Sequence, residues 1–392
     1  MTTIRKIAAN ILYHPHQGLI KQGFVIIENG IVKETGQLDK KETASTEFHN
    51  GLLLPGFVNA HCHLELSNIH IETSQIKGLG DFIEKIVNKK KESPPALAYM
   101  NKYDRMMSAN GISLVADIIS GTETFPVKER SQITYVSFIE LLGLDPTKSK
   151  SRIKQGETIK KTAEAFHQPS FFAAHSPYSC SENLLKDLIM KNNDAGSIFS
   201  IHNQESESEN ALFQAKESPL QKSLARITGK KYNYPSSRSS YEWLSTLLPA
   251  KSNILLVYNT FSNAEDIKQM KKRSPGLYPV LCPNANLLIE KEMPPVQAFY
   301  ESGLPICLGT DSIASNTTLS ILEEIKQIHK HFPEIPLTEL LRWGTLNGAR
   351  ALGMDHHFGS FKKGSSPGVI LIQNMDMHNL KLKKESTVRR IA

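Results

Sequence analysis

A pair of histidines near the amino end of the chain has the spacing of a metal half-site. His61-Cys62-His63 closes an apolar run, 52–60, that we interpret as a buried strand. Side chains at positions i and i+2 of a strand point to the same face, so both imidazoles can turn toward one point. Converging neutral imidazoles bind first-row metal ions. The structural alternative, two surface histidines, fits a buried strand poorly.

Three more residues that bind metals or move protons stand at or just after the ends of other apolar runs. His202 ends one run and Glu205 follows it, and Asp311 ends another run in Cys307-Leu-Gly-Thr-Asp311. Three histidines and one carboxylate form a donor set for one divalent ion, zinc first and iron(II) as the alternative, with water in a remaining position. All of them fall at the carboxyl ends of candidate strands, where barrel enzymes place their active sites.

The apolar runs that carry these residues recur through the middle of the chain, and each is followed by a polar, helix-compatible stretch. Apolar strands that alternate with helices predict a parallel sheet covered on both faces. Eight such units close into a (β/α)8 TIM barrel. The eight runs are 57–63, 112–119, 133–140, 171–175, 198–202, 254–259, 278–282 and 305–311.

The two ends of the chain are β-rich instead. Segment 24–36 carries Asn29-Gly30, a strong hairpin signal, and the run 369–372 is again strand-like. We expect the ends to pair into a small β-sandwich domain, with two unrelated edge hairpins as the alternative. The expected domains are a composite β-sandwich of residues 1–54 and 350–392, and a barrel of residues 55–349.

A long polar connection follows the fifth apolar run. Residues 217–240 are basic and contain Pro235 and a Ser-Ser-Arg-Ser-Ser run. We interpret this segment as a loop that forms a lid over the site.

The composition excludes several classes of protein. The chain has 392 residues, of which 40% are hydrophobic and 22% charged, so disorder and collagen-like fibres are excluded. The net charge of +7 is not gathered in a basic stripe with aromatic residues, so we expect no nucleic-acid partner. No signal peptide and no membrane helix is recognised. The four cysteines form no CxxC pair, which favours a reducing compartment, and we expect a cytoplasmic protein.

Four motifs at the predicted strand ends belong together. They are Leu54-Pro-Gly-Phe-Val-Asn-Ala-His-Cys-His-Leu-Glu-Leu-Ser67, Ala174-His-Ser-Pro-Tyr-Ser179, Ile201-His-Asn-Gln-Glu205 and Leu308-Gly-Thr-Asp311. This set resembles the amidohydrolase superfamily, and most of all its mononuclear branch of cytosine, adenosine, S-adenosylhomocysteine and aminofutalosine deaminases. The similarity runs in order from about residue 51 to residue 352. The motifs are poor guides to the substrate.

The resemblance implies a role for each residue of the set. One metal ion would be held by His61, His63, His202 and Asp311. A bound metal ion lowers the pKa of water toward 7. Glu205 would carry a proton from that water to the ring nitrogen and the leaving amine, a role that typically contributes about 10²–10⁴-fold. Asp311 can also accept the proton of the water.

Some of these assignments have structural alternatives. Glu205 begins an acidic run, so Glu207 or Glu209 could be the acid of the site instead. Asp311 could be an N-cap for the segment after it. No lysine ends the fourth or fifth run, which argues for a single metal ion.

Three residues are candidate substrate contacts. His175 resembles the substrate-contacting histidine after the fourth strand, although a histidine bonded to backbone explains it equally well. Glu65 lies two residues past His63 and could reach substrate or simply finish the strand. Asn286, with Asn284, follows another strand end, where turn asparagines are the slightly favoured interpretation.

The chain departs from the family pattern at the sixth strand. Relatives usually have His-Asn-Thr there, and this chain has Tyr258-Asn-Thr260, with no histidine between His202 and His329 to replace it. A phenol with a pKa of about 10 is a poor base at neutral pH. Either Glu205 and Asp311 are sufficient as proton acceptors and Tyr258 only positions the water, or the reaction is slowed or lost.

We therefore expect a metal-dependent aminohydrolase that deaminates an amino-substituted heterocycle such as a purine or a nucleoside. Its expected partner is a small-molecule substrate, and a homodimer is an expected assembly because related barrels often form one. One alternative is hydrolysis of a cyclic amide or a halogenated ring with the same activated water. Another is a non-catalytic ligand-binding barrel, and the only feature that favours it is Tyr258 in place of the usual histidine.

Overall fold

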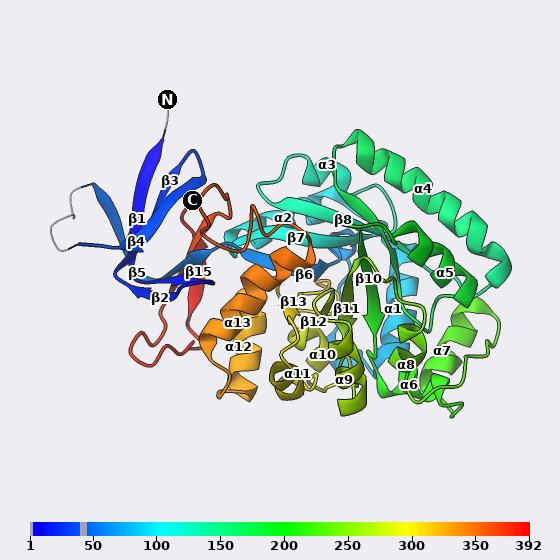
Figure 1. The fold of residues 1–392 in the computed structure, drawn as a ribbon. Coiled ribbons are helices and arrows are strands. Elements are labelled where there is room, and N and C mark those ends of the chain that lie inside the picture. The colour runs from blue at the N-terminus through cyan, green and yellow to red at the C-terminus, as the bar shows by residue number, and fades with distance from the viewer. Residues whose placement is uncertain (1–2, 40–44) are drawn as a thin grey trace.

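The computed structural model describes residues 3–39 and 45–392 and contains two sheets, one of eight strands and one of seven. Figure 1 shows the blue strands of the amino end beside the red β15 of the carboxyl end, at one side of the molecule. The middle of the chain forms the other part. The expected combination of a barrel with a separate sheet built from both chain ends is confirmed.

The eight-stranded sheet is parallel and follows the order of the chain from β6 to β13. Its first and last strands meet at a parallel bridge between Cys62 and Asp311. The backbone N–H groups of Thr310 and Asp311 also donate to the His61 carbonyl, at 3.0 and 3.1 Å. The strands are β6 (Phe57–Cys62), β7 (Ile112–Ile119), β8 (Thr134–Leu141), β9 (Ser170–Ala174), β10 (Ile198–Asn203), β11 (Asn253–Tyr258), β12 (Leu277–Leu281) and β13 (Cys307–Leu308).

Seven of the eight predicted runs agree with an observed strand to within one residue at either end. The eighth is shorter than predicted, because β13 stops at Leu308. Gly309 then passes close to the first strand, and a Cβ placed there would lie 2.8 Å from the Cβ of His61. Asp311 follows in the left-handed region, with a φ of 54°. The chain therefore turns at Asp311, the residue whose carboxylate faces His61 and His63.

Each face of the barrel wall packs against its own apolar cluster, because alternate residues of a strand point to opposite sides. In β7, Leu114, Ala116 and Ile118 belong to one cluster, and Val115 and Ile119 belong to the other. All eight residues of β7 are buried. Burial on both faces explains why the strands are near-continuous apolar runs in the sequence.

Helices fill the connections between the strands. Segment 217–240, expected to be a loop, contains helix α7, which begins at Pro219, a residue suited to the first helical position. The helices are α1 (Leu79–Glu92), α2 (Leu97–Ala109), α3 (Phe125–Lys128), α4 (Ser149–Ala165), α5 (Glu182–Lys191), α6 (Glu207–Phe213), α7 (Pro219–Thr228), α8 (Ser240–Ser245), α9 (Ala264–Lys272), α10 (Pro283–Ile289), α11 (Val296–Ser302), α12 (Ile321–His331), α13 (Leu337–Arg342) and α14 (Gly348–Ala351).

The second sheet has the order β15-β14-β5-β1-β3-β4, with β2 paired to β1. Asn29 and Gly30 both have positive φ, 51° and 80°, as the turn between β3 and β4 requires, so the predicted hairpin is confirmed. The domain division at residues 54/55 and 349/350 stays a prediction. The strands are β1 (Ile4–His14), β2 (Gly18–Lys21), β3 (Gly23–Glu28), β4 (Ile31–Gln37), β5 (Thr46–Pro55), β14 (Val369–Gln373) and β15 (Thr387–Arg390).

Two global features concern membrane crossing and the cysteines. Within residues 3–39 and 45–392, no helix has both the length and the apolar character that a membrane crossing requires. All four cysteines are buried free thiols.

A fully buried ion pair supports the end of β6. The Lys128 ammonium lies 2.7 Å from Oδ2 of Asp117, and neither side chain is exposed. Lys128 also donates to the Ser137 hydroxyl at 2.8 Å. The other oxygen of Asp117 accepts the backbone N–H of Leu64 at 2.8 Å. The pair therefore joins α3, β7 and β8 to the residue directly after His63.

Replacing Lys128 by Met should lower the free energy of unfolding by about 3–5 kcal/mol, because Asp117 would be left buried without a counter-charge. Urea denaturation of wild type and variant measures the difference. The matched control is Lys191→Met, which removes an exposed lysine paired with Glu157 and should change stability by less than about 1 kcal/mol. Equal effects of the two substitutions would contradict the role given to the buried pair.

Candidate functional site

The three histidines singled out in the sequence meet at one end of the barrel. His61 and His63 come from the end of β6, and His202 comes from the end of β10. Their candidate ligand atoms lie within 4.8 Å of one another, and all three residues are buried. The Nε2 atoms of His61 and His202 are 3.2 Å apart. The sequence spacing therefore does bring these imidazoles to one point.

Asp311 completes the cluster from the turn that follows the last strand. Its Oδ1 lies 3.5 Å from Nε2 of His61 and 3.4 Å from Nε2 of His63. Burial opposes ionisation of this carboxyl, but the neighbouring imidazoles of His61 and His63 hold its pKa below the ordinary value. Its side chain faces the cluster, so it does not serve as an N-cap. The carboxylate and the imidazoles share one small buried volume.

The protonation of these groups fits a divalent cation. The Nδ1 atom of His202 lies 2.7 Å from the carbonyl of His175, and a carbonyl only accepts, so Nδ1 carries the proton and Nε2 offers a lone pair. Burial lowers the pKa of His63 to about 4, and burial with nearby histidines lowers that of His202 well below its ordinary value. Neutral imidazoles and an ionised carboxylate are the forms that ligate metal, so this donor set fits zinc or iron(II).

Tyr258, at the end of β11, contacts the carboxylate of Asp311. Its hydroxyl donates to Oδ2 at 2.8 Å, and the Ser315 hydroxyl donates to the same oxygen. Burial and the charge of Asp311 raise the pKa of Tyr258 well above its ordinary value, so the phenol stays protonated. It acts as a donor to Asp311 and not as a base.

Glu205 stands three residues beyond His202 and is buried. The hydroxyl of Tyr178 donates to its Oε1 at 2.8 Å. Burial, followed by the nearby Glu209 carboxyl, raises the pKa of Glu205 well above the ordinary value. A carboxyl group with a raised pKa holds its proton to higher pH than an ordinary glutamate and can transfer it.

The neighbouring acids have other positions. Glu209 accepts the backbone N–H groups of Gln204 and Glu205 at 3.0 and 2.9 Å, which fixes the backbone where Gln204 has a φ of 51°. Glu207 is exposed to solvent. Of the three acids in the run, Glu205 alone lines the cavity at the cluster.

The cavity beside the cluster has a volume of about 430 Å³. One part of its lining is polar and contains His63, His175, His202, Glu205, Tyr258 and Asp311. The apolar part of the lining comes from two helices, which are also joined by an ion pair between Glu84 and Arg226. The helical residues are Leu79, Phe82, Ile83, Ile86 and Val87 of α1 and Leu224 and Ile227 of α7.

The predicted substrate contacts are placed differently from one another. His175 lines the cavity and its Nδ1 bonds the Ser179 hydroxyl at 2.8 Å. Glu65 also lines the cavity, but its oxygens accept from the Ser120 backbone N–H at 2.7 Å and from Lys90 at 2.8 Å. Asn286 donates to the Thr260 hydroxyl and is not among the described residues that line the cavity.

Comparison with known proteins assigns a family to this fold and site. Residues 52–385 match the model of the amidohydrolase family. The chain belongs to the amidohydrolase family. Enzymes of this family depend on a metal ion, and the imidazole cluster of this member lies at the expected end of the barrel.

Individual relatives of this amidohydrolase are distant but match over most of their length. The 5-methylthioadenosine/S-adenosylhomocysteine deaminase of Caldicellulosiruptor saccharolyticus is 25% identical over 95% of this chain and 85% of its own. The structure of Helicobacter pylori aminofutalosine deaminase with methylthio-coformycin is 20% identical and superposes with a TM-score of 0.81, covering 95% and 93% of the two chains. An adenosine deaminase from Xanthomonas campestris with bound zinc is 17% identical with a TM-score of 0.70, covering 94% and 84%.

Sequence reasoning missed several polar residues that line the cavity of this amidohydrolase, among them Tyr178, Glu140 and Lys90. Tyr178 lies in the His-Ser-Pro-Tyr motif itself and Glu140 ends a predicted run, so both carried a positional signal. Lys90 lies in a charged helix end and carried none. Burial raises the pKa of Glu140 to about 8.

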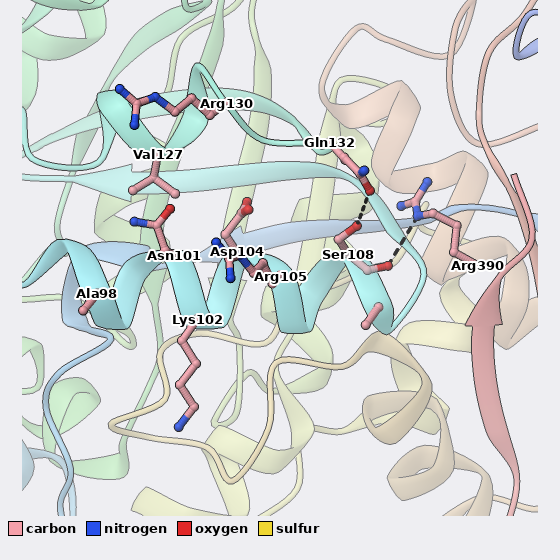
Figure 2. Close-up of a pocket in the computed structure, with 11 residues that line it drawn as sticks. Ala98, Asn101, Lys102, Asp104, Arg105, Ser108, Val127, Arg130, Gln132 and Arg390 are labelled. Atoms are coloured by element: carbon pink, nitrogen blue, oxygen red, sulfur yellow. Dashed lines mark hydrogen bonds between the residues drawn. The ribbon is translucent and has the colours of Figure 1, made fainter.

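A larger cavity of about 1110 Å³ lies away from the cluster, between α2, the turn before β8 and Arg390. In Figure 2 a dashed line joins Ser108 to Gln132 and another joins Ser108 to Arg390. Lys102 points down and Arg130 lies at the top of that view, so the basic side chains do not converge. No residue of the imidazole cluster lines this cavity. Its size alone does not indicate function.

Glu209 generates a prediction about pH. Burial raises its pKa from 4.5 to about 7, so the stability that depends on its protonated form is complete below pH 4.5 and is lost as the pH rises through about 7. The free energy of unfolding of wild type relative to Glu209→Gln should therefore fall across this window, by an amount on the order of 2–3 kcal/mol. Chemical denaturation from pH 4.5 to 8 measures it, with exposed Glu207→Gln as the control. A flat difference would contradict the assignment.

Proposed function

We propose that this amidohydrolase is a metal-dependent deaminase of an aminopurine nucleoside or a related amino-substituted heterocycle. The observation that carries the proposal is the cluster of three imidazoles and a carboxylate, with Glu205 beside it, opening into one cavity. In the reaction, water adds to the ring carbon that bears the amino group, and the carbon–nitrogen bond then breaks. The ring keeps an oxygen and ammonia leaves.

The relatives support the class of substrate. They include a 5-methylthioadenosine/S-adenosylhomocysteine deaminase and an aminofutalosine deaminase solved with methylthio-coformycin. The cavity volume of about 430 Å³ lies in the range of about 300–1,000 Å³ that small-molecule sites occupy. The mixture of apolar helix walls and a polar floor suits a flat heterocycle with a substituent.

The metal site is proposed to consist of His61, His63, His202 and Asp311. Zinc is the proposed ion, because nitrogen-rich tetrahedral sites favour it and because the Xanthomonas campestris structure contains it. A divalent ion bound here supplies Lewis-acid activation of water near neutral pH. The protein contributes neutral imidazoles. The ring of His202 is oriented by its Nδ1–H, which donates to the His175 carbonyl.

Glu205 is the proposed proton carrier, with Tyr178 as the residue that orients it. Tyr178 donates to Oε1, whereas no described residue donates to Oε2. Oε2 is thus the oxygen from which a proton can pass to a ring nitrogen. Once Glu205 is ionised, the same atom can take a proton from water and deliver it to the leaving amine.

Tyr258 and His175 have supporting roles in this proposal. The phenol of Tyr258 donates a hydrogen bond to Oδ2 of Asp311. Oδ1 faces the imidazoles, and it is the oxygen proposed to bind the metal ion or to accept a proton from water. Tyr258 is therefore a positioning residue, and the reaction does not need a base at this point of the barrel. His175 is the proposed substrate contact, because its Nε2 makes no hydrogen bond to a described residue.

Glu65 is proposed to act on the substrate through Lys90, since its oxygens are already bonded. A free small molecule is the proposed partner, without nucleic acid. The homodimer and the cytoplasmic location stay predictions from the sequence.

Purified protein should contain about one divalent ion per chain and release ammonia from at least one member of a panel of adenosine, 5′-methylthioadenosine, S-adenosylhomocysteine, guanine and cytosine. Removing the metal with a chelator should abolish release, and zinc should restore it. Glu205→Gln should lower kcat by about 10²–10⁴-fold while metal content stays unchanged. Glu207→Gln, the exposed neighbour, should behave as wild type. Metal-free, inactive wild-type protein would contradict the proposed function.

Tyr258→Phe removes one of the two hydroxyl donors to Oδ2 of Asp311, so zinc affinity should fall about 10–100-fold. Competition with a chelating dye measures this without any substrate. Tyr13→Phe, which removes a buried hydroxyl bonded to the Thr338 carbonyl, is the matched control and should leave zinc affinity unchanged. If Tyr258→Phe keeps full zinc affinity but loses turnover, Tyr258 acts on the reaction directly.

A further inference from the structure

Glu140 is a largely covered carboxyl group at the cavity wall that receives no hydrogen bond from another described residue. It lies near the end of β8, lines the cavity, and its side chain is only 9% exposed. Across residues 3–39 and 45–392, no group donates a hydrogen bond to either of its oxygens. Buried polar groups in folded proteins are rarely left in this state, and each exception calls for an explanation.

The neighbouring donors are already committed elsewhere. Nδ1 of His202 is 3.9 Å from Glu140, too far for a hydrogen bond, and its proton goes to the His175 carbonyl at 2.7 Å. The Lys90 ammonium lies 2.8 Å from Glu65 instead. A rearrangement of these side chains would break existing bonds in order to satisfy Glu140. The donor to Glu140 therefore comes from the cavity, from water or from a bound molecule.

We propose that Glu140 is a specificity-determining residue that accepts a hydrogen bond from an N–H or O–H group of the substrate. The inference rests on the proposed function, because the substrate would occupy the same cavity. The candidate ligand atoms of Glu140, His175 and His202 lie within 4.8 Å of one another, so a single hydroxyl or amino group fits between Glu140 and the His175 ring. The site thus selects substrates that carry a donor at this position.

A second metal ion is the competing occupant of this space, and the contacts disfavour it. The Nδ1 atoms of His202 and His175 are engaged by the His175 carbonyl and by the Ser179 hydroxyl. That leaves one carboxyl and one ring nitrogen, which is fewer than the three protein ligands usual for a zinc site.

The donor on the substrate has two chemical sources, a sugar hydroxyl or an extra amino group on the ring. One arm of the experiment compares kcat/KM for adenosine and 2′,3′-dideoxyadenosine, which lacks the hydroxyls. The other compares 2,6-diaminopurine riboside with adenosine, which lacks the second amino group. Each ratio is measured for wild type, Glu140→Leu, Glu140→Gln and the exposed control Glu129→Gln.

In wild type and Glu129→Gln, at least one ratio should favour the substrate with the donor, and Glu140→Leu should reduce that ratio about 10- to 100-fold. Glu140→Gln should reduce it by less, since its amide still accepts one hydrogen bond, and this variant decides the matter if Glu140→Leu does not fold. Ratios that are unchanged in the Glu140 variants would overturn the proposal. So would two metal ions per wild-type chain with one lost in Glu140→Gln.

Stability separates this inference from the proposed function. Because no residue bonds Glu140, the thermal midpoint of ligand-free Glu140→Leu should equal or exceed that of wild type. Binding of a ligand without the leaving 6-amino group should weaken about tenfold or more in the same variant, with purine riboside used if the donor is a hydroxyl and 2-aminopurine riboside if it is the ring amino group. Weaker binding without any ammonia release by wild type would refute only the deaminase function. A lower midpoint together with unchanged binding would show that Glu140 is structural.

Discussion

The meeting of the first and last barrel strands is the contact on which the site depends. The His61 carbonyl accepts backbone N–H groups from Thr310 and Asp311, which are about 250 positions away in the sequence. That pairing sets the Asp311 carboxylate against the imidazoles of His61 and His63. Gly309 makes the approach possible, since a side chain there would collide with β6. The same backbone contact therefore completes the fold and assembles the donor set.

Burial acts on three carboxyl groups around this point, and their pKa values shift in opposite directions. The carboxyls of Glu205 and Glu140 lie where few donors or cations face them, so burial raises their pKa values. Asp311 is equally buried, but imidazoles and hydroxyls surround it and keep its pKa low. Groups whose pKa values are driven apart in this way can divide acid and ligand roles between them. The cavity thus contains one carboxylate suited to a cation and two carboxyls suited to hold protons.

The sequence predicted the barrel and the cluster because both follow from short-range patterns. Apolar runs end at His61, His202 and Asp311, and parallel strands bring such ends to one edge. Glu140 also ends a run, but from the sequence alone a single acidic residue is interpreted as a solvent-exposed surface residue. The engagement of Glu65 by Lys90 and Ser120, and of Asn286 by Thr260, depends on loop paths that no local pattern encodes. The α7 helix escaped notice because its polar and basic residues resemble a loop.

The backbone at Tyr258 has a consequence for how this site could have arisen. Its φ of 77° lies in the left-handed region, which histidine, asparagine and aspartate enter far more readily than other non-glycine residues. Tyrosine is therefore retained against the local conformational preference. Histidine and tyrosine codons differ by a single base, so an ancestral imidazole could be exchanged for a phenol in one mutational step without rebuilding the loop. The backbone at position 258 thus suits an imidazole that can act as a base, whereas in this chain it presents a phenol that donates to the Asp311 carboxylate.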